Sequence, residues 1–313
     1  MTITFEEVQM YKNFDELAKD VLDLAREILP DQLFFLSSFT DTQQIILKLS
    51  SENSNMLVTE GMVLELNNTL CNRIDFDKKQ PLMYEDIQEE SNLDGLKKVL
   101  DQANVRSYLG IPISFMDGEK FGTLCAINDE KSRFDKKSID LLQRIVKMFS
   151  YYLVLERFAY RDTLTDLYNR RYLTKYFEEY SQGGGELFFL DLDGFKKVND
   201  NHGHEAGDEV LKEVASRLQR FANEQEKAIA VRLGGDEFLI NFSQTSSREE
   251  VSEKARQVLH LLSSWKTKYE LSASIGIVSY PVGRNIDLDT LLQQADEALY
   301  RAKTAGKNVF KFF

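Results

Sequence analysis

The ten residues VRLGGDEFLI, from Val231 to Ile240, constrain the fold of this 313-residue chain more than any other stretch. Apolar residues flank a Gly-Gly pair, and glycine permits the positive φ angles that a tight turn needs. The pattern therefore predicts a β-hairpin with two acids, Asp236 and Glu237, beside its turn. Taken alone, it also fits a turn that only carries solvated acids, and the neighbouring segments must decide between the two.

The segments around this hairpin predict an α+β domain over residues 160–313. Their order is helix, strand, helix, hairpin, helix, strand, helix, which is typical of ferredoxin-like and polymerase-palm-like sheets flanked by helices. The expected helices are 161–180, 207–222, 248–265 and 289–306, and the expected strands are 186–192, the hairpin 229–242 and 271–280, with 193–200 as a loop.

Three acids of this domain are predicted to converge at one edge of its sheet. Asp191 lies at the end of an apolar strand, and Asp236 and Glu237 lie at the hairpin turn. If the two elements are neighbours, the carboxylates repel one another unless a cation neutralises them. Carboxylate oxygens suit Mg²⁺ or Mn²⁺, and metal-bound carboxylates beside a phosphate site are the arrangement of two-metal nucleotidyl transfer.

The first half of the chain, residues 1–150, predicts a second unit in which helices pack on a sheet. Its clearest element is a hairpin at 105–128, where two β-rich apolar runs flank a polar turn. The other expected elements are a helix at 14–29, strands at 31–39 and 42–50, polar helix-compatible segments up to about 105, and a helix from 136 onward.

The helix that begins near Lys136 is predicted to continue to about residue 160 and to connect the two units. Apolar residues recur along it at alternating steps of four and three, which is the spacing of a heptad seam. One interpretation is a helix docked on the first sheet, and the other, favoured for its second half, is a parallel coiled coil that joins two protomers. The seam consists of Leu141, Ile145, Met148, Tyr152, Leu155 and Ala159.

Composition narrows the class of protein. The net charge of −12 and the pI near 4.9 argue against nucleic acid or an anionic membrane as a partner, because both select basic patches. No run approaches the roughly 20 apolar residues that span a bilayer, and the N-terminus lacks the basic-then-apolar order of a signal peptide. Two cysteines provide no disulfide framework. We therefore expect a cytoplasmic protein.

The hairpin segments YLGIPI (108–113) and FGTLCAIND (121–129), together with the order of elements, resemble a GAF domain, a small-molecule sensor fold. The resemblance implies an unidentified small-molecule or protein input, or a role in dimerisation alone. All three histidines lie beyond residue 200, which argues against a histidine-ligated haem in this domain. Cys71 and Cys125 lie in apolar-rich segments and are interpreted as structural thiols.

Six motifs occur in a fixed order between residues 160 and 313. They are DTLTDLYNRR (162–171), DLDGFKKVND (191–200), GHEAGDEVL (203–211), RLGGDEF (232–238), SASIGI (272–277) and ADEALYRAKTAGKN (295–308). Together they resemble the GGDEF family of diguanylate cyclases. The resemblance implies a metal-dependent enzyme that condenses two GTP into cyclic di-GMP and two pyrophosphates across a homodimer, under the control of the N-terminal domain.

The same resemblance assigns the metal site to Asp191, Asp236 and Glu237, with the Leu192 carbonyl as a further ligand. Asp236, Glu237 and Lys196 would be the catalytic residues. Glu237 would lie near the attacking 3′-hydroxyl, either as a second-metal ligand or as the proton acceptor, and the sequence does not separate these roles.

The resemblance also implies a set of residues that bind the substrate. A carboxylate fits the guanine edge, whose N1–H and exocyclic amine both donate, so Asp208 favours GTP over ATP. By position alone, Asp208 is better explained as a first-turn helix acid, and only the motif around it favours base recognition. Lys307, where many members have arginine, also fits a cation at a helix C-terminus. The set is Phe195, Lys196, Asn199, Asp208, Lys303 and Lys307, in which the three lysines are the candidate phosphate cations.

One feature of many family members is missing. Their product binds and inhibits at an Arg-x-x-Asp segment before the signature, and this chain has Gln225, Glu226, Lys227 and Ala228 there. We therefore expect no product inhibition through that site. The alternatives to this cyclase are a GTP-binding receptor without catalysis, which the retained acids and base-reading residues disfavour, and a cyclase for a mixed guanine–adenine dinucleotide, which Asp208 disfavours.

Overall fold

The structure is a computed structural model that describes residues 8, 11, 13–51, 55–115, 118–244, 246–264, 269, 271–283 and 287–313, with only the backbone of Asp94. The chain divides into two compact units, Met1–Glu156 and Arg157–Phe313. The N-terminal residues from which we predict the absence of a signal peptide lie almost entirely outside the described residues.

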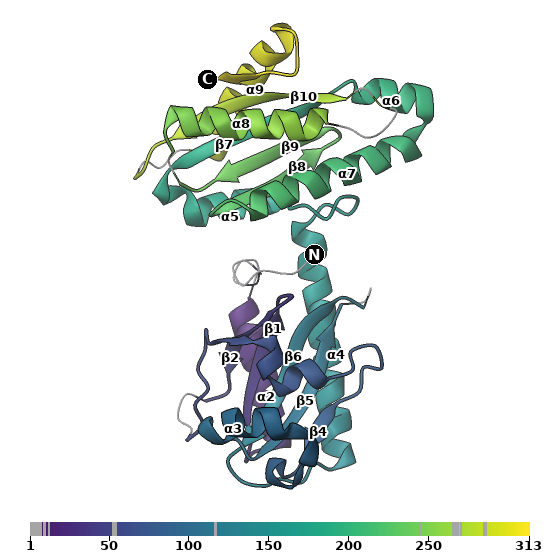
Figure 1. The fold of residues 1–313 in the computed structure, drawn as a ribbon, viewed down its shortest axis with the longest axis vertical. Coiled ribbons are helices and arrows are strands. Elements are labelled where there is room, and N and C mark those ends of the chain that lie inside the picture. The colour runs from purple at the N-terminus through teal and green to yellow at the C-terminus, as the bar shows by residue number, and fades with distance from the viewer. Residues whose placement is uncertain are drawn as a thin grey trace. The chain divides into compact units, whose positions relative to one another are not determined.

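The first unit is built on an antiparallel sheet with the strand order β3-β2-β1-β6-β5-β4 (Figure 1). Its strands are β1 (Leu33–Phe39), β2 (Gln43–Leu49), β3 (Val63–Glu65), β4 (Leu82–Tyr84), β5 (Ser107–Ser114) and β6 (Lys120–Asn128). Its helices are α2 (Phe14–Ile28), α3 (Asp94–Gln102) and α4 (Lys136–Tyr160). The predicted hairpin at 105–128 is therefore the pair β5 and β6.

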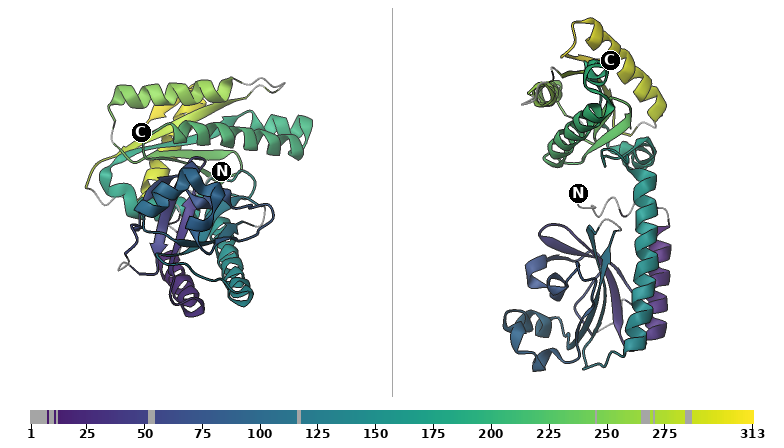
Figure 2. Two further views of the ribbon diagram at one scale, coloured as in Figure 1. Left: turned by 60° about the horizontal axis from the view of Figure 1, so that its bottom comes forward. Right: turned by 90° about the vertical axis from the view of Figure 1, so that its right-hand side faces the viewer.

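Two apolar layers enclose this sheet. Helices α2 and α4 lie side by side on one face (Figure 2), where the ring of Phe149 on α4 contacts Phe14 on α2 and Phe121 on β6 at centroid distances of 6.0 and 6.3 Å. On the other face, 3₁₀ turns and α3 cover a second apolar cluster, which includes both cysteines.

The polar segment between residues 51 and 105 differs from the prediction of helix-compatible structure. It contains the short strands β3 and β4 and four 3₁₀ turns in addition to α3. The strands β2 and β5 would otherwise leave rows of backbone N–H and C=O groups without partners, and short polar segments can pair with such edges. The pairing with a distant strand, rather than local pattern, therefore decides this segment.

Helix α4 carries two separate apolar stripes. One stripe is buried and docks on the unit to which it belongs; it consists of Leu142, Val146, Phe149 and Leu153. The other follows the predicted heptad seam, on which Leu141, Met148 and Leu155 are 38%, 71% and 67% exposed. The docked stripe and the predicted seam are thus two faces of one helix.

The second unit has the strand order β11-β10-β7-β9-β8, antiparallel except for the pair of β10 and β11. Helices α7 and α8 cover one face of the sheet and α9 covers the other (Figures 1 and 2). Its strands are β7 (Gly185–Asp193), β8 (Ala228–Gly234), β9 (Glu237–Phe242), β10 (Ser272–Tyr280) and β11 (Phe310–Phe312). Its helices are α5 (Arg170–Tyr180), α6 (Phe195–His202), α7 (His204–Asn223), α8 (Arg248–Ser263) and α9 (Leu288–Thr304).

The prediction of a loop at 193–200 is wrong, because most of this segment belongs to α6. Gly194 has a φ of 88° and turns the chain from β7 directly into this helix. Phe195 and Val198 are buried in the core that α7 shares with the sheet. This long-range packing stabilises a short, polar helix whose own pattern is weak.

The helix predicted at 161–180 forms only from Arg170 onward. Asp162 accepts hydrogen bonds from the backbone and hydroxyl of Thr165, and Asp166 has a φ of 58°, so a turn precedes the helix. Asn169 then caps α5 by accepting a hydrogen bond from the Tyr172 N–H. The short strand β11 was not predicted.

The α+β class and the two sheets agree with the prediction. Within the described parts of the chain, every helix is too short or too polar to traverse a bilayer.

Candidate active site

Two acids lie directly opposite each other on adjacent strands of the second sheet. Asp191 on β7 pairs in register with Glu237 on β9. Directly opposite residues on an antiparallel pair project from the same face, with Cβ atoms about 4.5–5.5 Å apart. Asp236 precedes Glu237 in the hairpin turn, where Gly234 and Gly235 have φ angles of 150° and 52°. The predicted convergence of the three acids is therefore observed.

A lysine from the opposite end of the domain sequence completes this acidic edge. Lys303, near the end of α9, places its Nζ 2.8 Å from Oδ2 of Asp191. The Asp191 side chain is only 16% exposed. Lys303 was predicted to contact phosphate, and the structure instead brings it to a predicted metal ligand.

Burial and neighbouring negative charges raise the pKa values of Asp191 and Glu237. Burial raises the pKa of Asp191, and the hydrogen bond and charge of Lys303 oppose that rise, while the charges of Asp236 and Asp193 add to it. Burial also raises the pKa of Glu237, and the charges of Asp191, Asp236 and Asp296 raise it further. Several carboxylates thus share one ammonium group, so the edge favours an additional cation.

The hairpin turn is held by an arginine that sequence reasoning did not single out. Arg232, 9% exposed, donates from Nε and Nη2 to the Gly235 carbonyl at 3.1 and 2.9 Å. Its Nη1 donates to Oδ1 of Asp162 at 2.7 Å. The Leu192 N–H lies 3.4 Å from the Asp236 carbonyl oxygen. The acids of the turn are therefore fixed from two sides.

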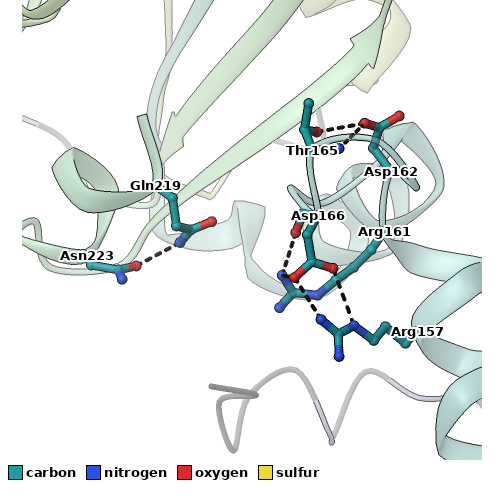
Figure 3. Close-up of polar contacts among 7 residues, drawn as sticks. All are labelled: Arg157, Arg161, Asp162, Thr165, Asp166, Gln219 and Asn223. Atoms are coloured by element: carbon teal, nitrogen blue, oxygen red, sulfur yellow. Dashed lines mark hydrogen bonds and ion pairs between the residues drawn. The ribbon is translucent and has the colours of Figure 1, made fainter. Parts of the chain in front are cut away.

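The turn before α5 anchors Arg232 in its place. Asp162 accepts from Arg232 at 2.7 Å. It also accepts from the Thr165 hydroxyl at 2.6 Å (Figure 3). Next to it, Asp166 accepts from Arg157 at 2.8 Å, and the Asp166 carbonyl accepts from Arg161 at 2.6 Å. The opening motif of the domain thus has a structural role under the signature hairpin.

Asp193, two residues after Asp191, is a second positioning residue that sequence reasoning missed. It is 8% exposed and accepts hydrogen bonds from the hydroxyls of Ser272 and Ser274, at 3.0 Å each. It also accepts from the backbone N–H of Asn308 at 3.1 Å. The spacing of two in Asp-Leu-Asp was a signal that both acids face the same side of the strand. Asp193 therefore ties the segment after α9 to β7.

The two predicted base-reading residues come together where α6 meets α7. Asn199 lies on α6, and a Cβ on Gly207 of α7 would be only 2.0 Å from its Oδ1. Asp208 follows Gly207 and is exposed. Oδ1 of Asn199 is buried and has no hydrogen-bond partner within the described structure.

Within the described residues, three predicted substrate-binding residues have no recorded contact with the acidic edge: Lys196, Phe195 and Lys307. Lys196 is exposed in the first turn of α6, not in a loop. Phe195 is buried in the core at 8% exposure. Lys307 is exposed after α9 and has a φ of 64°. None of these placements brings Lys196 or Lys307 to the acidic edge through a contact that the structure records.

The residues at the acidic edge suit a hard divalent cation. All their side-chain donors are carboxylate oxygens, and the Lys303 ammonium occupies the position of a counter-ion to Asp191. Over the described residues, no group of three or more His, Cys, Asp or Glu side chains is arranged as a ready-made metal cage.

Comparison with family models assigns both units. Residues 159–309 match the model described as "Diguanylate cyclase, GGDEF domain", and residues 12–148 match the model described as "GAF domain". The second unit is therefore a GGDEF domain and the first a GAF domain. The chain therefore joins a GAF domain to a diguanylate cyclase GGDEF domain.

Individual relatives agree with this assignment. Diguanylate cyclase DgcP of Escherichia coli (strain K12) is 28% identical in an alignment of 324 residues, gaps included. The alignment covers 93% of this chain and 91% of DgcP. Response regulator PleD of Caulobacter vibrioides is 35% identical over 162 residues, 48% of this chain and 35% of PleD. A crystal structure of the coiled coil and GGDEF domain of DgcB from Caulobacter crescentus, in complex with c-di-GMP, is 27% identical with a TM-score of 0.50, and the match covers 56% of this chain and 97% of that one.

Proposed function

We propose that this protein condenses two GTP into cyclic di-GMP and two pyrophosphates across a homodimer, with the N-terminal domain as the regulatory input. The observation that carries the proposal is the pair of opposed acids, Asp191 and Glu237, with Asp236 at the adjacent turn. An acidic edge next to a helix pair that offers a carboxylate and a free amide acceptor suits a guanine nucleotide with a bound cation.

The cation would be Mg²⁺ or Mn²⁺, held by Asp191, Asp236 and the Leu192 carbonyl, with Glu237 beside it. When bound, it offsets negative charge at the α-phosphate and makes the phosphorus more electrophilic. A cation that uses Oδ2 of Asp191 would displace Lys303 from that oxygen, and the ammonium group would then be available to the phosphates. Lys196 and Lys307 would add positive charge to the triphosphate from α6 and from the segment after α9.

Recognition of the base would rest on Asn199 and Asp208. The Asp208 carboxylate would accept from the N1–H and amine of guanine, and adenine offers an acceptor at N1 instead. The unpartnered Oδ1 of Asn199 would accept a further hydrogen bond. Phe195 would support this site from the core, through its packing at the start of α6.

In the reaction, the 3′-hydroxyl of one GTP attacks the α-phosphate of the other, and pyrophosphate leaves. Glu237 is exposed and has a raised pKa, which suits a group that accepts the proton of the attacking hydroxyl. A second transfer closes the ring. One domain holds one GTP, so two GGDEF domains must face each other, and most of the catalysis is positioning and charge neutralisation.

The domain plan supports the dimer. Residues 1–150 would form the sensor, 160–313 the cyclase, and 136–160 the connecting helix, whose exposed seam offers Met148 and Leu155 to the same helix of a second copy. The protein would act in the cytoplasm. Removal of residues 1–150 should change the rate, and a dimer of unchanged activity after this removal would contradict regulation by the N-terminal domain.

The direct test incubates the purified full chain with GTP and Mg²⁺ and resolves the products by chromatography, beside Asp236→Ala. We expect cyclic di-GMP from the wild type alone. If the dimeric chain binds GTP but forms no product, the cyclase proposal is wrong and the protein is a nucleotide receptor. We also expect no inhibition by added product through Gln225–Ala228, because these residues lack the arginine and aspartate of the inhibitory segment.

A further inference from the structure

The two cysteines of the chain meet inside the GAF domain, although 54 positions separate them. Cys125 lies on the central strand β6, and Cys71 lies on a 3₁₀ turn, Leu70–Arg73, that covers the sheet. Their Sγ atoms are 3.5 Å apart, and both thiols are free and buried. Neither lies in a position that local sequence would bring to the other, so the fold itself creates the pair.

Polar side chains surround the two sulfur atoms in an otherwise apolar layer. Three of them donate to Sγ of Cys71: Gln44 Nε2 at 3.1 Å, Tyr108 Oη at 3.2 Å and Thr123 Oγ1 at 3.5 Å. Sγ of Cys125 donates to Thr123 Oγ1 at 3.2 Å. Three donors on one sulfur suit a thiolate, since hydrogen bonds to an ionised acceptor are stronger than those to a neutral one.

The backbone opposite Cys125 is shaped for this network. Gly110 pairs with Cys125 across β5 and β6, and a Cβ at this position would lie 2.1 Å from Oη of Tyr108. Any side chain there would displace the tyrosine hydroxyl from Cys71. A glycine in the middle of a paired strand weakens that strand, and here it makes room for the donor.

The two thiols also differ in their acidity. Burial alone would raise the pKa of Cys71, but hydrogen bonds from Cys125, Tyr108, Thr123 and Gln44 outweigh it and lower the pKa to about 7. Burial raises the pKa of Cys125, and its contact with Cys71 raises it further. Near neutral pH Cys71 is therefore the thiol of the pair that ionises and Cys125 the one that keeps its proton, which suits a nucleophile and its resolving partner.

Small molecules have a route to Cys71. A cavity of about 390 Å³ reaches it and is lined on its other sides by residues such as Phe39, Phe76 and Lys120. The cavity can hold a molecule of a few heavy atoms next to Cys71. In the same cluster, the buried Oε1 of Gln44 has no hydrogen-bond partner among the described residues.

We propose that Cys71 and Cys125 form an oxidisable dithiol whose substrate is a small hydroperoxide. The Cys71 thiolate attacks the terminal oxygen of the hydroperoxide, the O–O bond breaks, and Cys71 becomes a sulfenic acid. The departing hydroxide or alkoxide takes a proton from solvent and leaves as water or an alcohol. This step needs no group from the GGDEF domain and is independent of the proposed cyclase reaction.

In the second step, the Cys125 sulfur attacks the Cys71 sulfur and the S–O bond breaks. The hydroxyl leaves with the Cys125 thiol proton as water, and the disulfide remains. The sulfur pair has lost two electrons and the peroxide has gained them. Closure brings the sulfurs from 3.5 Å to a bond of about 2.05 Å, a movement of about 1.5 Å that a 3₁₀ turn can supply without a change in the sheet.

The test treats the reduced full chain with hydrogen peroxide and measures the thiol titre and a non-reduced tryptic map. We expect the titre to fall from two per chain to zero, with one cross-linked species that joins residues 49–73 to residues 121–131 and disappears on reduction. The same chain unfolded in urea should form this link much more slowly, because only the fold brings the sulfurs together.

Three variants separate the roles. Cys125→Ser should stop at a Cys71 sulfenic acid, which a cyclic dione traps, and Cys71→Ser should form neither that adduct nor a disulfide. Tyr108→Phe keeps the ring but loses one donor, and should slow oxidation roughly tenfold, the rate ratio for one lost hydrogen bond to a charged group. Lys98→Met, an exposed position on α3 in the same unit, is the matched control and should oxidise like the wild type.

Two results would overturn the proposal. In the first, the native wild type keeps both thiols titratable under peroxide that oxidises the unfolded chain. In the second, the disulfide forms only between chains, or the trapped sulfenic acid lies on Cys125. The thiol titre and the cross-link are measured on the wild type, and circular dichroism checks that each variant is folded before its oxidation is measured. A variant that fails to fold therefore does not decide the outcome.

Discussion

Asp191 on β7 and Glu237 on β9 occupy one register position on adjacent antiparallel strands, so their carboxylates project from the same face of the sheet. Like charges in directly opposite positions destabilise a sheet. The only basic side chain recorded in contact with this pair within the described structure is Lys303, which lies on Asp191. The arrangement is unfavourable for stability and suitable for binding a cation.

Removal of one of the two opposed charges should separate function from stability. Glu237→Gln should lower cyclase turnover by roughly 10²–10³-fold, as for loss of one preorganised polar group in an active site. It should also raise the free energy of unfolding at neutral pH by about 0.2–1 kcal/mol, because the repulsion with Asp191 is relieved. Turnover with GTP and urea denaturation measure the two effects. Glu253→Gln on the exposed surface of α8 should change neither, and a parallel loss of activity and stability in Glu237→Gln would contradict the interpretation.

Lys303 should compete with the metal when no nucleotide is present. Its ammonium lies 2.8 Å from the Asp191 carboxylate and must leave before a cation can use that oxygen. Lys303→Met should therefore bind Mn²⁺ about two- to fivefold more tightly in the absence of GTP, which corresponds to about 0.5–1 kcal/mol for a partly exposed ion pair. Titration calorimetry measures the affinity. Lys307→Met is the comparison, since Lys307 has no recorded contact with Asp191, and equal affinities in the two variants would count against competition.

Gly207 should control the position of the Asn199 amide. A methyl group at Gly207 would lie 2.0 Å from Oδ1 of Asn199 and push the amide aside. We expect Gly207→Ala to raise the KM for GTP about tenfold, which is about 1.4 kcal/mol. In an Asn199→Ala background the same change should have no further effect on KM, so the double-mutant cycle should show a coupling energy within about 0.5–3 kcal/mol. Additive effects would show that Gly207 acts on the fold and not through Asn199.

The ion pair of Arg232 and Asp162 should make stability depend on pH in a defined direction. Burial by itself would raise the pKa of Asp162, but hydrogen bonds from Thr165 and Arg232, with the charge of Arg232, lower it below its ordinary value of 3.8. A carboxylate with a lowered folded pKa contributes stability above the unfolded pKa, and this contribution is lost as the pH falls through the folded pKa.

We therefore expect Asp162→Asn to lower the free energy of unfolding by about 1–3 kcal/mol at neutral pH, as for hydrogen bonds to a charged group. The difference from the wild type should shrink as the pH falls below the ordinary value of 3.8 and vanish once the pH is below the lowered pKa of Asp162 in the folded protein. Denaturation at several pH values measures it. Asp289→Asn, which breaks an exposed pair with Arg170, should show little difference at any pH; a deficit in Asp162→Asn that persists in acid would point to packing and not to charge.

The exposed seam of α4 should determine self-association. Met148 and Leu155 are 71% and 67% exposed, while the opposite stripe of the same helix is buried within the unit. Leu155→Glu should weaken the dimer roughly hundredfold, because it places a charge where an apolar side chain would be buried. Sedimentation equilibrium measures the change. Lys147→Glu, at an exposed position off the seam, should leave the dimer intact, and a wild-type monomer at high concentration would exclude the parallel coil.

Much of the fold was accessible to sequence reasoning because it depends on short-range physics. The Gly-Gly turn, the apolar strand that ends at Asp191, and the amphipathic helices follow from turn chemistry and periodicity over a few residues. Where this local signal is weak, the predictions were wrong: α6 depends on the burial of Phe195 and Val198 against α7, and β3 and β4 depend on the edges of distant strands.

The sequence by itself determined the main helices and strands, the α+β class and the acids that end up at the sheet edge. Only the tertiary structure decided which side chains meet. Strand register places Glu237 opposite Asp191. The docking of α9 brings Lys303 to Asp191 from more than a hundred residues away. In the GAF domain the turn over the sheet brings Cys71 to Cys125 in the same way. Such contacts arise from the pairing of strands and the packing of helices over long sequence distances, and no local pattern encodes them.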